Sequence, residues 1–267
     1  MKHTLLLAIV MVVALGSSVL GVGFLGTPTA EIGQGNWSIG YDYSYSSQDT
    51  EKTRASFSID GGTPDLFEFK LKDLNVQRHY ATIGYGLTPD WDVYVKLGIA
   101  DVKGQGKDFG TPGDPNDPGS DWGMNFDNKF AWGWGTRYTF ARHDNIAWGA
   151  ALQMNWLDTE LTKRDGDSRD KFTFDSYDLL ISAGPTVDMG GWKVYGGPFY
   201  YYLNGEYKGT YERPGTTANE KADIRADRNW GGFIGSTVDL GHNLNWTIEY
   251  STTGKGWGLG TGIAWSF

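Results

Sequence analysis

Side chains that carry acid–base chemistry are scarce in this sequence and poorly placed for catalysis. Cysteine is absent, which excludes disulfides and thiolate metal sites. The four histidines are scattered over an apolar leader, two predicted turns and the outward side of a predicted strand: His3, His143, His242 and His79. A general base must lie within hydrogen-bonding reach of the proton that it removes, and none of these positions offers that geometry. We therefore expect no catalytic residues and no enzymatic activity.

Aspartates gather in two glycine-containing stretches, GDPNDPGSD at 113–121 and RDGDSRD at 164–170. Spaced carboxylates can supply the oxygen ligands that Ca²⁺ prefers. Neither stretch has the EF-hand spacing with its distal glutamate, and Arg164 and Arg169 would oppose a cation. We expect solvated loop charge here, with no metal and no cofactor, and weak calcium binding in these loops stays open.

Charged residues also occur inside segments that otherwise alternate apolar and small side chains. Strand parity places four of them on one inner face, about four to six residues from the same end of their strands: Asp42, Lys96, Arg137 and Glu249. Charges in a narrow interior persist when they are paired or hydrated. The sequence therefore predicts a luminal network of two acids and two bases at one level.

The composition is typical of a chain in which only every second residue meets an apolar environment. Apolar residues make up 39% of the 267 positions, yet aromatic residues reach 15% and there are 39 glycines. A transmembrane β-barrel explains this combination, because lipid-facing side chains alternate with small or polar side chains that face the interior. A soluble β-sandwich would instead carry polar residues on its outward face. The formal net charge of −9 makes nucleic acid an unsuitable partner.

The amino terminus has the pattern of a secretory signal peptide. Lys2 precedes an apolar run at 5–15, and small residues follow at 16–18. The run is too short to cross a bilayer as a helix, which takes roughly 20 residues. We expect a signal peptide at 1–21, an N-terminal periplasmic segment at 22–34 and the barrel at 35–267. Cleavage after Gly21 and cleavage after Ala30 are both acceptable, and an uncleaved anchor is the alternative.

Alternating segments and connections follow one another in a fixed rhythm of long loops and short turns. We predict ten strands, at residues 35–47, 73–87, 91–102, 127–140, 146–158, 175–189, 192–203, 227–240, 244–251 and 256–267. Long polar loops are expected at about 48–72, 103–126, 159–174 and 204–226. An even number of antiparallel strands places both chain ends on the periplasmic side and the long loops outside the cell. Eight strands are the alternative, if one hairpin does not join the wall.

Tryptophan recurs near the start of alternate predicted strands, at Trp37, Trp91, Trp148, Trp192 and Trp246. Indole is amphipathic and settles at a bilayer interface, so a row of tryptophans at one height predicts half of an aromatic girdle. Outward tyrosines near the other strand ends would form the second half: Tyr41, Tyr43, Tyr45, Tyr200 and Tyr202.

The last predicted strand ends at the C-terminal residue, Phe267, and alternates strictly. Leu259, Ile263 and Trp265 share its outward face, while glycine, alanine and serine share the inward face. A terminal Phe with apolar residues two, four and eight positions earlier resembles the signal by which outer-membrane proteins are recognised for assembly. With the leader and the rhythm of loops, residues from about 35 to 267 resemble the small Gram-negative outer-membrane barrels, the OmpA-like and opacity-type group. The resemblance implies the outer membrane as location, with lipid, lipopolysaccharide and the barrel-assembly machinery as partners.

Architecture alone does not fix activity. We expect a monomeric structural or surface-interaction protein, adhesin-like, with a largely side-chain-filled lumen and loops that contact an unknown extracellular ligand. A narrow porin-like channel for small solutes is the alternative hypothesis. In its predicted strand number the barrel also resembles the omptins, which are outer-membrane proteases. This resemblance implies a third hypothesis, a protease at the rim of the barrel. The dispersed histidines leave this hypothesis unsupported.

Overall fold

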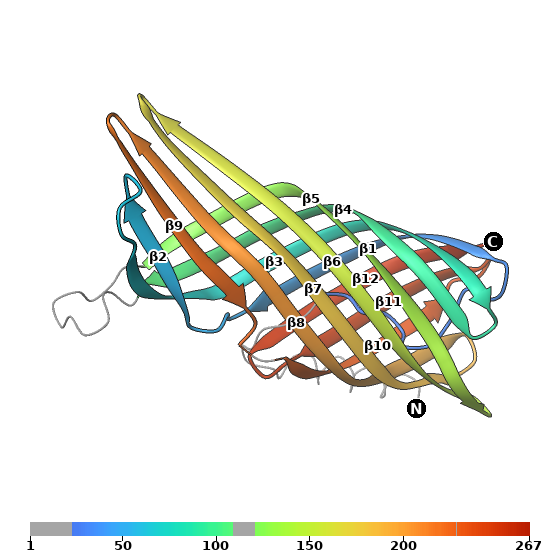
Figure 1. Cartoon of the computed structure of the whole chain (residues 1–267). Helices are drawn as coiled ribbons and strands as arrows, with labels where there is room; N and C mark the ends of the chain where they lie inside the picture. The colour runs from blue at the N-terminus through green and yellow to red at the C-terminus, as the bar shows by residue number, and fades with distance from the viewer. Residues whose placement is uncertain (1–22, 109–120, 228) are drawn as a thin grey trace.

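Ten strands close into a single antiparallel ring in the computed structural model, which describes residues 23–108, 121–227 and 229–267 (Figure 1). The ring strands are β1 (Trp37–Gln48), β3 (Asp65–Thr88), β4 (Trp91–Asp108), β5 (Asp121–His143), β6 (Ile146–Asp165), β7 (Ser168–Asp188), β8 (Trp192–Arg213), β10 (Trp230–Asp239), β11 (Leu244–Thr252) and β12 (Gly256–Ser266). The ring closes because β1 pairs with β12 on one side and with β3 on the other. The predicted ten-stranded barrel is confirmed.

One end of the ring carries short turns and both ends of the barrel sequence. Turns at 89–90, 144–145, 189–191 and 240–243 join consecutive strands there, and β1 begins and β12 ends at the same level. Several of these turns need left-handed backbone, which Asp144 and Asn243 adopt with φ of 51° and 60°. We call this the short-turn end and the opposite one the hairpin end.

The hairpin end differs from the sequence prediction, because most residues expected in long loops continue as strands. β6 and β7 pair without interruption up to Asp165 and Ser168, and β8 reaches Arg213. Two further strands, β2 (Thr53–Ile59) and β9 (Thr216–Arg225), pair with each other and join β3 to β8 above the ring. Figure 1 shows these extensions rising beyond the ring as long hairpins. Their many charges suggested loops, yet period-two alternation continues through them. Part of the predicted loop at 103–126, residues 109–120, lies outside the described residues.

Apolar side chains fill the interior at the hairpin end. They come from both the ring and the added strands, and each is at most 4% exposed: Leu71, Leu74, Val102, Phe126, Phe174, Leu203, Tyr207 and Ile224. We call this set the hairpin-end core. Its packing explains why the extensions are ordered, since burying the inward face of each strand stabilises the pairing.

The outer surface carries two aromatic rows with an aliphatic band between them. Near the short-turn end, Trp37, Trp91, Trp148 and Trp246 are 43–49% exposed, whereas Trp192 is half-buried. The second row consists of ring pairs with centroids 4.3 to 6.1 Å apart: Trp132–Trp156, Tyr43–His79, Tyr45–Trp257, Tyr200–Trp230 and Tyr177–Tyr202. Outward Ile39, Val95, Leu97 and Ile248 lie between the rows and are 43–51% exposed. This is the surface that a lipid bilayer requires of a barrel.

No helix long and apolar enough to cross a membrane occurs in the part of the chain that the structure describes.

The hairpin-end core supplies a stability prediction. Phe174 is 1% exposed, so Phe174→Ala should lower the free energy of unfolding by about 3–5 kcal/mol through lost burial and a cavity. Ile59→Ala is the control, because Ile59 is 53% exposed at the end of β2 and should change stability by less than about 0.5 kcal/mol. Denaturant unfolding in detergent micelles measures both. Equal effects of the two substitutions would contradict a packed core at this end.

Candidate functional site

The chain enters the interior of the ring before its first strand. Residues 23–32, which we call the luminal segment, run inside the ring, and Gly23, Leu25, Gly26 and Thr29 are buried there. The sequence predicted a separate periplasmic segment at 22–34, whereas the structure places residues 23–32 against the inner wall of the ring. The physical reason is that the stretch Gly23 to Ala30 carries no charge and contains small and apolar side chains that fit the interior. The predicted leader at 1–21 lies outside the described residues.

The inner part of the luminal segment is held by Glu249 of β11. The Glu249 carboxylate accepts hydrogen bonds from Leu25 N at 2.8 Å and from Gly26 N at 3.0 Å. The Tyr195 hydroxyl donates to the same carboxylate at 3.1 Å. Because Glu249 is only 3% exposed, these donors replace the water that the carboxylate has lost.

The outer part of the luminal segment is held in the same way by Asp92 of β4. The Asp92 carboxylate accepts from Glu31 N at 2.6 Å and from Ile32 N at 3.2 Å. Between the two carboxylates, Ala30 N donates to Thr139 Oγ1 at 3.0 Å, and the Thr29 and Thr186 hydroxyls are 2.8 Å apart. Two buried acids from the wall therefore each bind two successive backbone N–H groups of the segment.

Glycines on the inward face of the wall make room for this segment. A Cβ on Gly260 would lie 2.5 Å from the Phe24 ring, and one on Gly149 would lie 2.5 Å from Pro28 O. A Cβ on Gly84 would lie 2.5 Å from Ile32 Cδ1. The inner face of the barrel is thus shaped to the luminal segment along its length.

The four predicted luminal charges all lie inside, but only two of them pair with each other. Lys96 Nζ lies 3.5 Å from Asp42 Oδ2, and Thr82 donates to the same oxygen at 2.6 Å. Arg137 instead lies 3.1 Å from Asp92 and 3.8 Å from Glu31. Glu249 binds backbone N–H groups.

Asp92 is the functional residue that the sequence prediction missed. It is completely buried, and it lies directly opposite Arg137 in the pairing of β4 with β5. The signal was present, because the parity that places Tyr94 and Lys96 inside places Asp92 inside as well. Glu31 could not have been found in this way, since it precedes the first strand.

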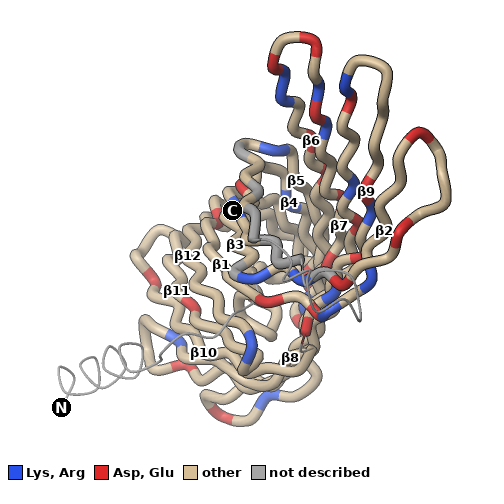
Figure 2. Tube along the Cα trace, turned by 90° about the vertical axis from the view of Figure 1, so that its left-hand side faces the viewer, with Lys and Arg blue, Asp and Glu red and all other residues tan. Residues whose placement is uncertain are grey.

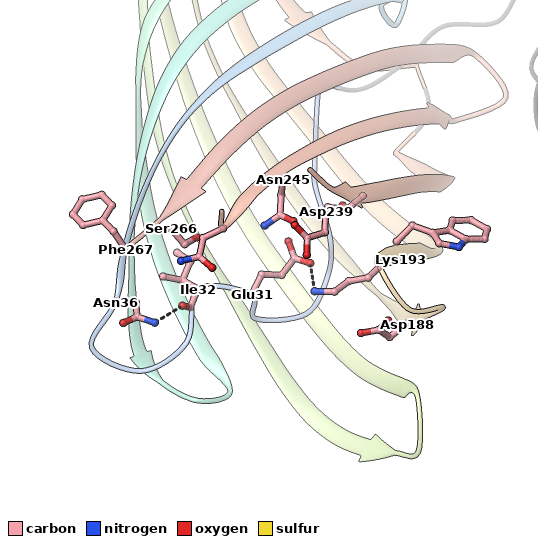
Figure 3. Close-up of a pocket in the computed structure, with 13 residues that line it drawn as sticks. Glu31, Ile32, Asn36, Asp188, Lys193, Asp239, Asn245, Ser266 and Phe267 are labelled. Atoms are coloured by element: carbon pink, nitrogen blue, oxygen red, sulfur yellow. Dashed lines mark hydrogen bonds and ion pairs between the residues drawn. The ribbon is translucent and has the colours of Figure 1, made fainter. Parts of the chain in front are cut away.

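The short-turn end opens into a cavity of about 390 Å³ below the luminal segment (Figure 3). Figure 3 shows Glu31 reaching across it towards Lys193, and the two charges are 3.2 Å apart. Asp188, Asp239 and Asn245 complete much of its polar lining. Farther in, the free space narrows to about 90 Å³ around Phe24, Lys96 and Arg137. The cavity is therefore a shallow vestibule that ends at the segment.

The predicted assembly residues lie on the outer surface along β12, from Leu259 opposite Tyr45 to Phe267 at the short-turn end. Leu259, Ile263, Trp265 and Phe267 are 38–57% exposed on or just after β12. The backbone of Phe267 exchanges two hydrogen bonds of 2.9 Å with Trp37, so the terminal residue helps to close the ring. Its recognition by the assembly machinery stays a prediction.

The charges of the hairpin end lie mostly in ion pairs between neighbouring strands, and Figure 2 shows both signs interspersed there. Lys171 Nζ lies 2.9 Å from Glu160, and Arg213 pairs with Asp170. Glu206 accepts hydrogen bonds from Lys208 and Lys221, which hold the pKa of its carboxyl below the usual value. Across the described residues, no group of three or more His, Cys, Asp or Glu side chains could hold a metal ion. The aspartates at 114 and 117 lie outside the described residues.

Glu249 gives a direct test of how the segment is held. Glu249→Leu removes the acceptor of two segment N–H groups, and hydrogen bonds to charged groups contribute about 1.5–3 kcal/mol each. Exchange of the Leu25 and Gly26 amide hydrogens should then accelerate at least tenfold in hydrogen-exchange mass spectrometry. Glu249→Gln keeps one acceptor oxygen and should give a smaller change. Unchanged protection in both variants would show that the contact is not holding the segment.

Comparisons with known proteins agree with the architecture. No family model and no curated protein matches the sequence. Among solved structures, the outer membrane protease OmpT from Escherichia coli is similar over 86% of this chain and 97% of its own, with a TM-score of 0.50 and 11% identity. The outer membrane protein OprG from Pseudomonas aeruginosa is similar over 88% of this chain and 97% of its own, with a TM-score of 0.50 and 10% identity. At these identities the likeness concerns the fold. The molecule therefore has the fold of the outer-membrane β-barrels.

Proposed function

We propose that this barrel is a closed, non-enzymatic scaffold that presents a strand-built module at the cell surface for contact with an extracellular partner. The surface module comprises β2, β9 and the extensions of β3 to β8 beyond the second aromatic row. The observation that carries the proposal is that the interior is filled twice in succession, first by the luminal segment and then by the hairpin-end core.

Two barriers of different kinds oppose a water path. The luminal segment is tied to the wall by Glu249 and Asp92, and displacing it would take from each of these buried carboxylates the two backbone N–H groups that it binds. The hairpin-end core is apolar, and Leu71, Val102, Phe126 and Ile224 are all fully buried within it. A solute would have to pass both barriers, which favours a filled scaffold over a pore.

The surface module has the build of a contact surface. Its strands are paired and its charges are largely compensated, so its shape is fixed before any partner arrives, and a preformed surface lowers the entropic cost of binding. Ile59 and Leu66, on β2 and β3, are 53% and 56% exposed although they belong to a module with its own core. Lipopolysaccharide of the outer leaflet would surround the base of this module at the second aromatic row.

The positions of the histidines support a non-enzymatic role. The His79 ring nitrogen lies 2.6 Å from the Tyr41 hydroxyl on the outward side of the wall, where lipid is expected. His143 and His242 lie at the short-turn end, opposite the surface module. In the described part of the chain, therefore, no histidine lies at the rim beside the surface module. A protease like the one that shares this fold would need its general base there.

A narrow channel is the second candidate, and one observation favours it. Lys96 and Arg137 line the small inner space of about 90 Å³, so polar atoms and free volume coexist beside the segment. A conducting path would require movement of the segment together with an opening of the hairpin-end core.

Planar-bilayer recording tests the proposal. The full-length mature protein should produce no conductance steps, because both barriers are closed. A variant that lacks residues 23–32 should also remain silent, since the hairpin-end core still seals the interior. Steps in the full-length protein that change with Lys96→Ala would support the channel and contradict the closed scaffold.

A further inference from the structure

The sheet is open between β5 and β6 at the hairpin end, although it is closed below. β5 pairs with β6 only as far as Ala131 and Leu157, whereas β6 continues to Asp165 and stays paired with β7 throughout. On its other side β5 stays paired with β4 up to Asp121. In Figure 1 the β6–β7 hairpin rises to the top of the picture, while the start of β5 lies lower. Residues 158–165, which we call the β6 edge, therefore border a strand on one side only, as far as the described residues extend.

A β-bulge in β5 lies where its pairing with β6 ends. The register of β4 with β5 shifts just beyond Ala100, where two residues of β5 lie opposite one residue of β4. Asn128 lies in this bulge with a left-handed φ of 52°, and its N–H donates to Asp101 Oδ1 at 2.5 Å. A bulge bends its strand and interrupts the ladder. The gap between β5 and β6 thus has a defined structural cause in the wall.

The backbone groups of the β6 edge point into this gap. The Glu160 carbonyl accepts from Lys129 Nζ of β5 at 2.5 Å, so it is directed towards β5 and away from β7. Successive residues of a strand direct their N–H and C=O groups to opposite sides, so Thr162 and Arg164 present theirs to the gap as well. Such a row of backbone groups is a template for a further strand.

The two faces of the β6 edge differ in character. Leu157 and Thr159 are buried on the inward face, and Leu161 packs against the buried apolar residues there. Asp158 and Thr162 are exposed on the outward face. A strand added at this edge would therefore need apolar side chains on one face and polar side chains on the other.

Acidic side chains lie on the outward face next to this edge. Asp158 lies directly opposite Asp175 of β7, which lies opposite Glu206 of β8. Glu206 is compensated by Lys208 and Lys221, whereas Asp158 and Asp175 form no ion pair within the part of the chain that the structure describes. Like charges that are directly opposite each other destabilise a sheet. The outward face beside the edge therefore favours a basic neighbour.

We infer that the β6 edge is the docking site of the surface module, and that it takes an extended polypeptide segment of an extracellular protein as an added strand. The segment pairs through its backbone with residues 158–165, places apolar side chains next to Leu161 and places a basic side chain opposite Asp158. Main-chain hydrogen bonds provide the affinity in this mode of recognition, and the alternating side chains provide the selectivity. The inference rests on the proposed function and names its contact site and its class of partner.

A second copy of this chain fits the edge poorly. Copies in one membrane share the same orientation, and barrel strands tilt by about 35–45° from the axis of the barrel. A twofold axis along the membrane normal would make the two β6 edges cross instead of running side by side. A separate polypeptide has no such constraint.

Amide hydrogen exchange of the protein in detergent micelles tests the open edge without any ligand. Protection should alternate along β6: amides at 160, 162 and 164 should exchange at least about tenfold faster than those at 159, 161 and 163, which face β7. Uniform protection from 159 to 164 would show that the edge is already covered and would overturn the inference.

Peptide binding tests the docking itself. The probe is a fluorescent peptide of about eight residues in which lysine and valine alternate, and the comparison peptide has glutamate in place of lysine. Thr162→Pro removes an N–H group of the edge and leaves the ladder to β7, whereas Thr162→Val keeps that group. Fluorescence anisotropy should show equal binding to the wild type and Thr162→Val, and binding about tenfold weaker to Thr162→Pro. The glutamate peptide should bind the wild type about tenfold more weakly.

Equal binding of the two peptides, or equal binding to the two folded Thr162 variants, would contradict docking at this edge. A dimer in micelles that Thr162→Pro dissociates would identify a second copy as the occupant and would also overturn the inference.

The acidic row supplies a matched pair of charge variants. Asp158→Asn removes a charge at the edge and should weaken binding of the lysine peptide about threefold. Asp223→Asn removes a charge of the same cross-strand row on β9, opposite Glu206, and should leave binding unchanged. Equal effects of the two substitutions would indicate attraction by overall charge and would refute the assigned position. Conductance steps would refute the closed scaffold without affecting these results, whereas a silent barrel that binds neither peptide would refute the docking site alone.

Discussion

The structure depends on the satisfaction of backbone hydrogen bonds where no water can supply them. Within a bilayer an open sheet edge is costly, so the ring must close, and here the closing contact is the long register between β1 and β12 together with the pairing of Phe267 and Trp37. Closure fixes the register of all the remaining ring strands. It also divides the side chains into two populations, because period-two alternation sends one to the lipid and the other to the lumen.

The side chains that face the lumen then determine what the interior can contain. Glycines such as Gly149 and Gly260 remove side-chain volume from the wall, and Glu249 and Asp92 supply acceptors for N–H groups that no wall strand offers. The luminal segment meets both conditions, with an uncharged stretch at 23–30 and two pairs of successive donors. Wall and segment are therefore complementary parts of one core. Above them the interior becomes apolar, and the hairpin-end core supports strands that continue the pairing of the ring beyond the second aromatic row.

Much of the ring follows from the sequence because its causes are local. The predicted strand starts at residues 91, 146, 192, 244 and 256 coincide with the observed ones. Each follows a short turn, and the last four of these turns contain residues in left-handed backbone. The hairpin extensions were missed because their charges obscured an alternation that Phe174 and Tyr207 continue inward. The position of the luminal segment could not be predicted, since it rests on contacts more than 200 residues apart in sequence, such as Leu25 with Glu249. Strand parity predicts that Asp42 and Lys96 lie inside the barrel. It does not predict which acid pairs with Arg137, because that depends on the cross-strand register and on the position of Glu31.

The central claim is that the chain's own N-terminal segment occupies the lumen, with Phe24 lying against β12. Nuclear Overhauser effects between the Phe24 ring protons and the α-protons of Gly260 and Gly262, recorded on the mature protein in detergent micelles, test this claim most directly. We expect strong cross-peaks to both glycines and ring shifts far from those of an unstructured peptide. A Phe24 ring with the shifts of a free peptide and no cross-peak to β12 would contradict the account.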